Sequence, residues 1–293
     1  MTFDRAAAPS ALLLIAALAA ASPAPAQEVA AVLSSAPGPY QAAFDGFLKA
    51  FGREVSHVRL PARPPAEGAR VVVAFGGEAA VQPYPHGATL IACMAPGLGA
   101  RLRHRGPFAF VSMKPAPGRL LSELRRLQPG LKRLAVLTDG RDTAGYVPDL
   151  RRAGAAIGME IVSPRAAGPN GVPSALRALL AAKADAIWLA PDPSLATPEN
   201  FQTIKQFSWD NRVPFYAPTR GLAVAGAAAA VSVGAEEEGR LAADLARRAL
   251  AGEELPEVVY PTRTSITVNL ESARNAGLVV PLDALGKGVE ALR

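Results

Sequence analysis

The chain has 293 residues, half of them hydrophobic, and carries a formal net charge of +6 with both signs scattered along its length. This length and this hydrophobic content allow one large domain or two lobes of ordinary size, each with a substantial core. The dense basic cluster at 101–105 has no interleaved aromatic residues, which argues against a nucleic-acid partner. The single cysteine, Cys93, excludes an intramolecular disulfide, and we expect it to pack as a small hydrophobic residue.

Residues 1–26 have the pattern of a secretory signal peptide. Arg5 precedes an apolar stretch at 11–21, and Ala24-Pro25-Ala26 places small residues before a cut near Ala26. The apolar stretch is too short to span a bilayer, which takes about 20 residues. We therefore expect export to the periplasm with cleavage near Ala26, and a retained anchor is the alternative.

From Glu28 onward, short apolar runs alternate with amphipathic segments. The first half predicts strands at 29–33, 55–60, 70–75, 88–94 and 108–112, and a helix at 39–51. The proline-rich segment 61–68 is too short and broken for a full helix. The second half predicts strands at 131–137, 160–162, 186–189, 213–217 and 266–270, and helices around 120–127, 147–156, 173–182, 198–207 and 235–251.

The segment 184–218 predicts one complete parallel crossover. The buried strand 186–189 stops at Pro191-Asp192-Pro193, and Thr197 can cap a helix whose first turn accepts Pro198. Ligands of open α/β sheets bind beyond the carboxyl ends of the strands, and Asp192 falls at that position.

Two rounds of alternating strands and helices, separated at about 118–130, predict two doubly wound α/β lobes joined by a hinge. A barrel would need eight even units, and the first half is too irregular for that. We expect residues 27–118 and about 220–258 to form the first lobe. Residues 119–219 and about 259–293 would form the second.

The chain lacks the usual catalytic motifs, so we expect no enzyme, no metal and no cofactor. Its three histidines have no zinc-binding spacing, and it has no nucleophile elbow or Walker loop. A carboxylate pair of Asp139 with Asp192 remains a catalytic alternative, although carboxylates at turns are more often structural.

The remaining candidates are polar or aromatic residues in the segments that end the strands, where they would line a ligand cleft. Each also has a structural explanation, such as a helix cap, a turn or core packing. The predicted ligand-binding residues are Ser34, Tyr40, Gly77, Glu78, Met94, Asp139, Tyr146, Asp192 and Tyr216.

Several segments together resemble the tryptophan/tyrosine-type ABC transporter substrate-binding proteins. They are 129–137, 185–188 with Pro191-Asp192, 213–217, Gly226-Ala227, Glu238-Gly239-Arg240 with 242–244, and 268–270 ahead of 276–278. The resemblance covers roughly 115–285 well and the first lobe loosely. It implies a type I periplasmic binding fold: two flavodoxin-like lobes that close on a small molecule such as an amino acid. The implied protein is a monomer that presents its ligand to an ABC permease or another inner-membrane protein.

The first-lobe loops depart from the pattern of that family. Gly76-Gly77-Glu78 stands where the family usually has a Gly-Thr/Ser-Pro turn, and Ala95-Pro96 replaces an Asp-Pro pair. Two functions therefore stay open: a solute receptor for an importer, and a periplasmic interaction or sensor-input module with the same fold.

Overall fold

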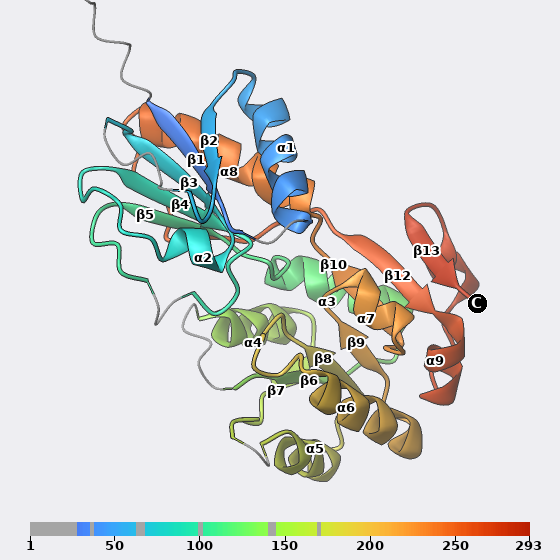
Figure 1. Ribbon diagram of the computed structural model, residues 1–293. Helices are drawn as coiled ribbons and strands as arrows, with labels where there is room; N and C mark the ends of the chain where they lie inside the picture. Colours follow the sequence, from blue (N-terminus) through green and yellow to red (C-terminus); the bar gives the residue numbers. More distant parts are fainter. Residues whose placement is uncertain (1–27, 36–37, 63–67, 99–101, 140–144, 169–170) are drawn as a thin grey trace, which may run out of the picture.

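The computed structural model describes residues 28–35, 38–62, 68–98, 102–139, 145–168 and 171–293. These described residues form two α/β lobes, each built on one mainly parallel sheet (Figure 1). The predicted fold class is confirmed. The predicted signal peptide, 1–26, lies outside the described residues.

The first lobe contains a six-stranded sheet in which every described strand pair is parallel. The strand order is β11-β5-β4-β3-β1-β2. Its elements are β1 (Val29–Leu33), α1 (Pro39–Phe51), β2 (Ser56–Arg59), β3 (Val71–Phe75), α2 (Gly77–Ala80), β4 (Thr89–Cys93), β5 (Phe108–Val111), α8 (Ala235–Leu250) and β11 (Val258–Val259).

Both faces of this sheet are covered, which explains why its central strands β1 and β3 are apolar throughout, whereas the edge strand β2 carries polar residues. Alternate residues of a strand point to opposite faces: Val71 and Val73 pack under α1 and α8, whereas Val72 and Ala74 pack under α2 and the segment after it. Cys93 is fully buried in the first of these cores, as expected.

Helices α1 and α8 approach each other closely because glycines stand at their contact. A Cβ built on Gly239 would lie 1.8 Å from the Ala43 carbonyl oxygen, and one built on Gly46 would lie 2.5 Å from the Glu236 carbonyl oxygen. No side chain fits at either position without moving main chain. The two helices therefore form one rigid layer over the sheet.

The second lobe contains a seven-stranded sheet in the order β13-β12-β10-β9-β8-β6-β7. Its described pairs are parallel except β10 with β12, which is antiparallel. Its elements are α3 (Pro117–Leu127), β6 (Arg133–Leu137), α4 (Tyr146–Ala156), β7 (Glu160–Val162), α5 (Gly171–Ala181), β8 (Ala186–Leu189), α6 (Pro198–Asn211), β9 (Phe215–Ala217), α7 (Arg220–Val224), β10 (Ala229–Ser232), β12 (Ser265–Asn269), α9 (Leu270–Asn275), the 3-10 helix η2 (Leu282–Leu285) and β13 (Val289–Leu292).

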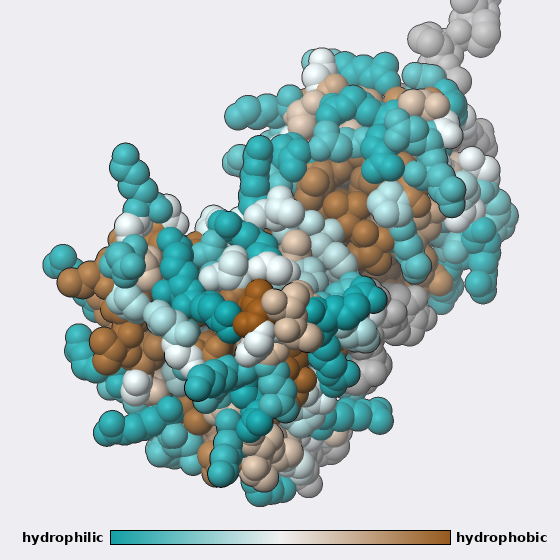
Figure 2. All heavy atoms as spheres, turned by 180° about the vertical axis from the view of Figure 1, so that it is seen from behind, coloured by the Kyte–Doolittle hydropathy of each residue, from teal (hydrophilic) through white to brown (hydrophobic). Residues whose placement is uncertain are grey.

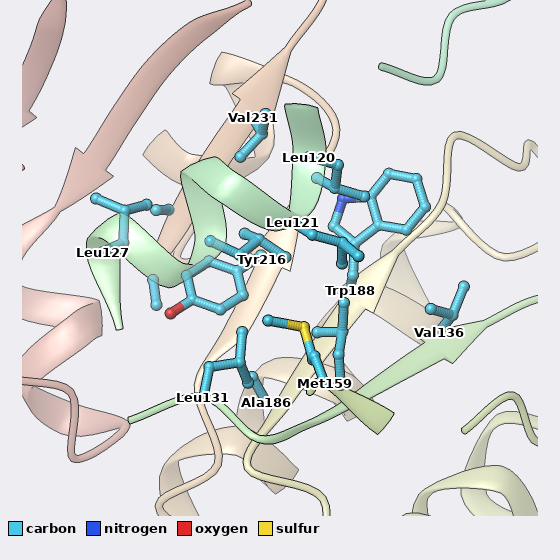
Figure 3. Close-up of a cluster of buried hydrophobic side chains, with 14 of the residues drawn as sticks. Leu120, Leu121, Leu127, Leu131, Val136, Met159, Ala186, Trp188, Tyr216 and Val231 are labelled. Atoms are coloured by element: carbon cyan, nitrogen blue, oxygen red, sulfur yellow. The ribbon is translucent and has the colours of Figure 1, made fainter. Parts of the chain in front are cut away.

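The second sheet also separates two cores. Under α3 and α4, the fully buried Trp188 and Tyr216 pack among leucines of α3 (Figure 3). On the other face, Phe201 and Ile204 of α6 pack against Phe215 of β9. The predicted cap of α6 is present, since the Thr197 hydroxyl accepts the Asn200 N–H at 3.3 Å.

The lobes are joined where the chain leaves β5 and β11. The extensions of these paired strands stay hydrogen-bonded, from Ser112 N to Val259 O at 2.9 Å and from Ala116 N to Pro261 O at 2.7 Å. Viewed from the back, the lobes are two largely hydrophilic masses joined at a narrower waist (Figure 2).

The chain returns to the first lobe later than we expected from the sequence. The expected first-lobe segment at about 220–258 includes α7 and β10, but β10 pairs with β9 and β12 in the second sheet. Only α8 and β11 belong to the first lobe. The alanine-rich strand β10 is fully buried at Ala229 and Ala230, so it needs no bulky side chains.

The close contact of α1 and α8 predicts a large effect of Gly239→Ala on stability. The added methyl group would collide with main chain, and overpacking of this kind costs about 1–3 kcal/mol. We expect the free energy of unfolding, measured by urea denaturation, to fall by about 3 kcal/mol.

Gly118→Ala is the matched control, because Gly118 lies in helix α3 and a Cβ there meets nothing within 4 Å. This variant should be unchanged or slightly more stable, since alanine favours helix. Equal stabilities of the two variants would contradict the close packing of α1 and α8.

Candidate functional site

The carboxyl ends of the strands in both lobes converge at the hinge. Tyr146 is the first residue of α4, the helix that follows β6 along the chain, and its hydroxyl donates to the Pro115 carbonyl oxygen at 2.7 Å. Pro115 lies on the segment that leaves the carboxyl end of β5. The ligand-binding edge of one sheet is therefore brought next to that of the other.

Asp139, Asp192 and Ser194 form a polar cluster at the ends of β6 and β8, which we call the second-lobe edge. The Ser194 hydroxyl lies 2.7 Å from Asp192 Oδ1 and 3.3 Å from Asp139 Oδ2. The Ser194 N–H also donates to Asp192 Oδ1 at 2.9 Å. Two predicted site residues are thus brought together, with a serine between them that the sequence analysis did not single out.

The second-lobe edge has two carboxylates and one shared hydroxyl. Asp139 is only 6% exposed, and Asp192 is half-buried. A hydroxyl has a single proton, so Ser194 can donate fully to one carboxylate at a time. Two neighbouring carboxylates repel one another, and a cationic donor between them relieves that repulsion. Arg165 Nε also donates to the Asp139 carbonyl oxygen at 3.2 Å, so one cationic side chain already lies beside this edge.

Ser34, Ser35, Tyr40, Gly76, Glu78 and Met94 form the corresponding surface of the first lobe, which we call the first-lobe edge. Ser34 is buried, and its hydroxyl accepts the Ala79 N–H at 3.1 Å. Gly76 has φ +100°, and a Cβ there would lie 2.4 Å from Ser34 Oγ and 2.7 Å from Tyr40 Cε1. Ser34 and Tyr40 are therefore packed tightly on the turn after β3.

Glu78 is committed to a contact within the same edge. Its Oε2 accepts the Ser35 hydroxyl at 2.5 Å and the Ser35 N–H at 3.0 Å. These two hydrogen bonds lower the pKa of the exposed Glu78 carboxyl. The neighbouring Gly77 is half-buried, and a Cβ there would meet nothing within 4 Å, so no close contact demands a glycine at that position.

Met94 ends β4 in the left-handed conformation, with φ 53°, and is 7% exposed. Its N–H donates to Oε2 of Glu238, a buried residue of α8, at 2.9 Å. Glu238 is not among the residues predicted from the sequence. It is one of three consecutive glutamates at the start of α8, and nothing in the sequence distinguishes the one that points inward.

Tyr146 and Tyr216 contribute to the core of the second lobe. Both are fully buried, and the Tyr216 hydroxyl donates to Gln128 Oε1 at 2.8 Å. Burial raises the pKa of Tyr216 far above its usual value. The Tyr146 ring packs against Trp188 and Tyr260, with ring centroids 5.7 and 5.2 Å away. Neither ring is available on a solvent-facing surface.

Two grooves lie away from these edges, and neither is lined by any predicted site residue. One of about 690 Å³ lies beside the hinge among α1, the start of α8 and residues 263–265. The other, of about 600 Å³, lies between α5 and α6. The first-lobe edge and the second-lobe edge are thus identified by their place at the converging strand ends, and neither groove contributes to them.

The described residues contain no group of three or more histidine, cysteine, aspartate or glutamate side chains placed to hold a metal ion. Within the same residues, no helix combines the length and the hydrophobicity that crossing a bilayer requires.

Solved structures share this two-lobed architecture. The chain is 17% identical to the ligand-free, open form of a substrate binding protein with adhesive properties from Clostridium difficile, with a TM-score of 0.63 over 91% of this chain and 99% of that one. It is 16% identical to an ABC domain in complex with L-Trp from Streptococcus pneumoniae, with a TM-score of 0.59 over 90% and 100% of the two chains. These likenesses define a type I periplasmic binding fold.

Residues 121–288, more than half of the chain, match the family described as ABC transporter substrate binding protein. The chain belongs to this family, as the sequence resemblance predicted. Members bind small molecules, work with ABC permeases and generally act outside the cytoplasmic membrane. No curated protein sequence matches the chain.

The burial of Tyr216 predicts that Tyr216→Phe affects stability and leaves ligand binding unchanged. Removing the hydroxyl leaves the Gln128 oxygen without its donor, which costs about 1–3 kcal/mol. We expect a loss of about 1 kcal/mol in the free energy of unfolding. An unchanged stability together with weaker binding of a solute would place Tyr216 in the ligand site instead.

Proposed function

We propose that the protein is a periplasmic solute receptor that captures a small molecule bearing a positively charged amino group, such as an amino acid, and delivers it to an ABC importer. The solute lies between the first-lobe edge and the second-lobe edge. The observation that carries this proposal is the pair of carboxylates, Asp139 and Asp192, around one serine hydroxyl at the converging strand ends.

The chemistry of the second-lobe edge supports the choice of solute. An ammonium group has three N–H donors and no acceptor, so it can bond Asp139 and Asp192 together while Ser194 keeps its own proton. Hydrogen bonds between charged partners contribute about 1.5–3 kcal/mol each. The pneumococcal structure, whose bound L-Trp carries such an amino group, offers a precedent for this class of solute.

We propose that this capture involves no chemical reaction on the solute. Differential contacts in the open and closed arrangements of the lobes drive closure, and the permease recognises the closed form. The proposed route is export with cleavage near Ala26, followed by action as a monomer in the periplasm.

One feature of the first-lobe edge favours the alternative, a periplasmic interaction or sensor-input module. Glu78 is already bonded to Ser35, and Ser34 and Tyr40 are packed against Gly76. Glu78 and Ser34 thus have hydrogen-bond partners within the lobe without a solute. Such an edge suits a rigid surface for a membrane-protein partner.

A thermal-shift screen separates the two functions. The library holds amino acids and small amines, with nucleosides and organic acids as uncharged and anionic comparisons. We expect a rise in melting temperature for amino-bearing compounds, because ligands that bind only the folded state stabilise it. A library without any such rise would reject the receptor and favour the interaction module.

Asp192→Ala should weaken binding of the compound that the screen identifies. The loss of one charged acceptor removes about 1.4 kcal/mol or more, which corresponds to a dissociation constant at least about tenfold higher by calorimetry. Folding stability should change little, since Asp192 is half-buried and its carboxylate bonds only to nearby Ser194 among the described residues.

Asp210→Ala is the matched control. Asp210 is exposed near the far end of α6, where it accepts the Gln206 amide at 2.7 Å. This variant should bind the solute like the wild type. An unchanged dissociation constant for Asp192→Ala would remove Asp192 from the site.

A further inference from the structure

A buried carboxylate of α8 lies behind the first-lobe edge. Glu238 is 1% exposed, and its Oε2 accepts the Met94 N–H at 2.9 Å. The other buried glutamates, Glu123 and Glu237, each form ion pairs with arginines. In the part of the chain that the structure describes, no basic side chain pairs with Glu238 in this way. Burying an ionisable carboxyl group without a basic partner costs free energy, and a hydrogen bond to the group offsets part of that cost.

The position of this carboxylate is fixed by the helix that carries it. The next residue, Gly239, lies against the main chain of α1, where even a methyl group has no room. Helix α8 therefore cannot turn or slide to move Glu238 away from β4. The close packing of α1 on α8 therefore fixes the Glu238 side chain next to the Met94 N–H.

Met94 needs this support because of its backbone. Its φ of 53° lies in the left-handed region, which is unfavourable for a residue with a side chain. A hydrogen bond from its N–H is about twice as strong when the acceptor is an ionised carboxylate as when it is a neutral acid. Glu238 is thus placed to hold the end of β4 in an otherwise disfavoured conformation.

Main-chain contacts connect the end of β4 to the first-lobe edge. The residue before Met94, Cys93, accepts the Gly76 N–H at 2.9 Å through its carbonyl oxygen. Gly76 in turn lies against Ser34 Oγ and the Tyr40 ring. A change in the conformation of Met94 can therefore alter the position of Gly76, through the hydrogen-bonded ends of β3 and β4, and with it the position of the Tyr40 ring.

We propose that Glu238 is a positioning residue of the solute site: it holds Met94 and, through Gly76, sets the first-lobe edge, and the loss or gain of its proton changes how firmly that edge is held. The name of the site rests on the proposed function, but the contacts from Glu238 to Tyr40 do not.

Burial raises the pKa of Glu238 to about 8, and the hydrogen bond from Met94 opposes that rise. Deprotonation near this pH strengthens the bond to the Met94 N–H, because a carboxylate is a better acceptor than a neutral acid. The folded-state pKa lies above the ordinary value of 4.5, so the folded state holds this proton more tightly than the unfolded chain does. The contribution of that proton to folding stability is fully present below pH 4.5 and is lost as the pH rises through about 8.

Few other titratable groups face Glu238. The buried Cys93 thiol of β4 is the nearest, and burial, together with the charge of Glu238, raises the pKa of Cys93. Strands β3 and β5 carry no titratable side chain. The packed helices also carry the exposed Asp45, Lys49 and Glu236, the partly buried Tyr40, and a set of ion-paired side chains: Glu237, Arg240, Asp244, Arg247 and Arg248.

The test follows two nuclear magnetic resonance probes in the protein without solute, between pH 6 and 9. One is the amide of Met94 in protein labelled with [15N]methionine, assigned by its loss in Met94→Leu. The other is the Tyr40 ring in protein labelled with [13Cε]tyrosine, assigned by Tyr40→Phe. We expect both resonances to shift with a common midpoint near pH 8.

In Glu238→Gln, which keeps an acceptor oxygen and cannot ionise, both pH-dependent shifts should disappear. Glu236→Gln is the matched control: Glu236 is exposed on the same turn of α8, so both shifts should remain. The wild-type titration by itself decides the matter if Glu238→Gln does not fold.

Two results would overturn the proposal: no shift of Met94 in this range, or a shift of Met94 with a motionless Tyr40 ring. Neither probe requires a solute, so an empty thermal-shift screen would reject the receptor function and leave this result standing.

Discussion

The paired main-chain segments that leave β5 and β11 are the constraint on which the rest of the structure depends. Hydrogen bonds from Ser112 to Val259 and from Ala116 to Pro261 keep the two segments together across the hinge. Two parallel neighbouring strands end at the same edge of a sheet, so both segments leave from the carboxyl ends of the first sheet. The second lobe is therefore attached at that edge. The Tyr146 hydroxyl then anchors α4 to Pro115, which brings the second sheet's carboxyl ends to the same place.

Much of this fold could be predicted from the sequence, because each predicted element carries its own local pattern. The crossover at 184–218 is an example: Thr197 caps α6, and Phe201 and Ile204 are buried on one of its faces, as their spacing predicted. The pattern fails in the alanine-rich region around β10. A run of alanines does not distinguish one face of a strand or helix from the other. A strand that is buried on both faces also lacks the alternation of apolar and polar residues by which strands are recognised.

The candidate site could be predicted in part, and the side-chain direction explains which part. Asp139 and Asp192 come after the last residue of a strand, where a side chain can reach the edge of the sheet. Tyr216 lies within β9, so its ring must point to a face of the sheet, and there it enters the core. Glu238 could not be predicted, because its role depends on how closely α8 packs against α1.

The two edges differ in a way that assigns them different roles in the proposed capture. The first-lobe edge is satisfied internally, with Glu78 bonded to Ser35 and the end of β4 held from behind by Glu238. The second-lobe edge instead concentrates two carboxylates on one serine hydroxyl. Groups that are held by hydrogen bonds within the protein present a fixed surface to a ligand. Carboxylates that share one hydroxyl donor are stabilised further when a ligand supplies another donor. In the proposed capture, the second lobe would recognise the charge of the solute and the first lobe its shape. The match at 121–288 fits this division, because it contains the whole second-lobe edge and, from the first lobe, the helix α8 that sets the end of β4.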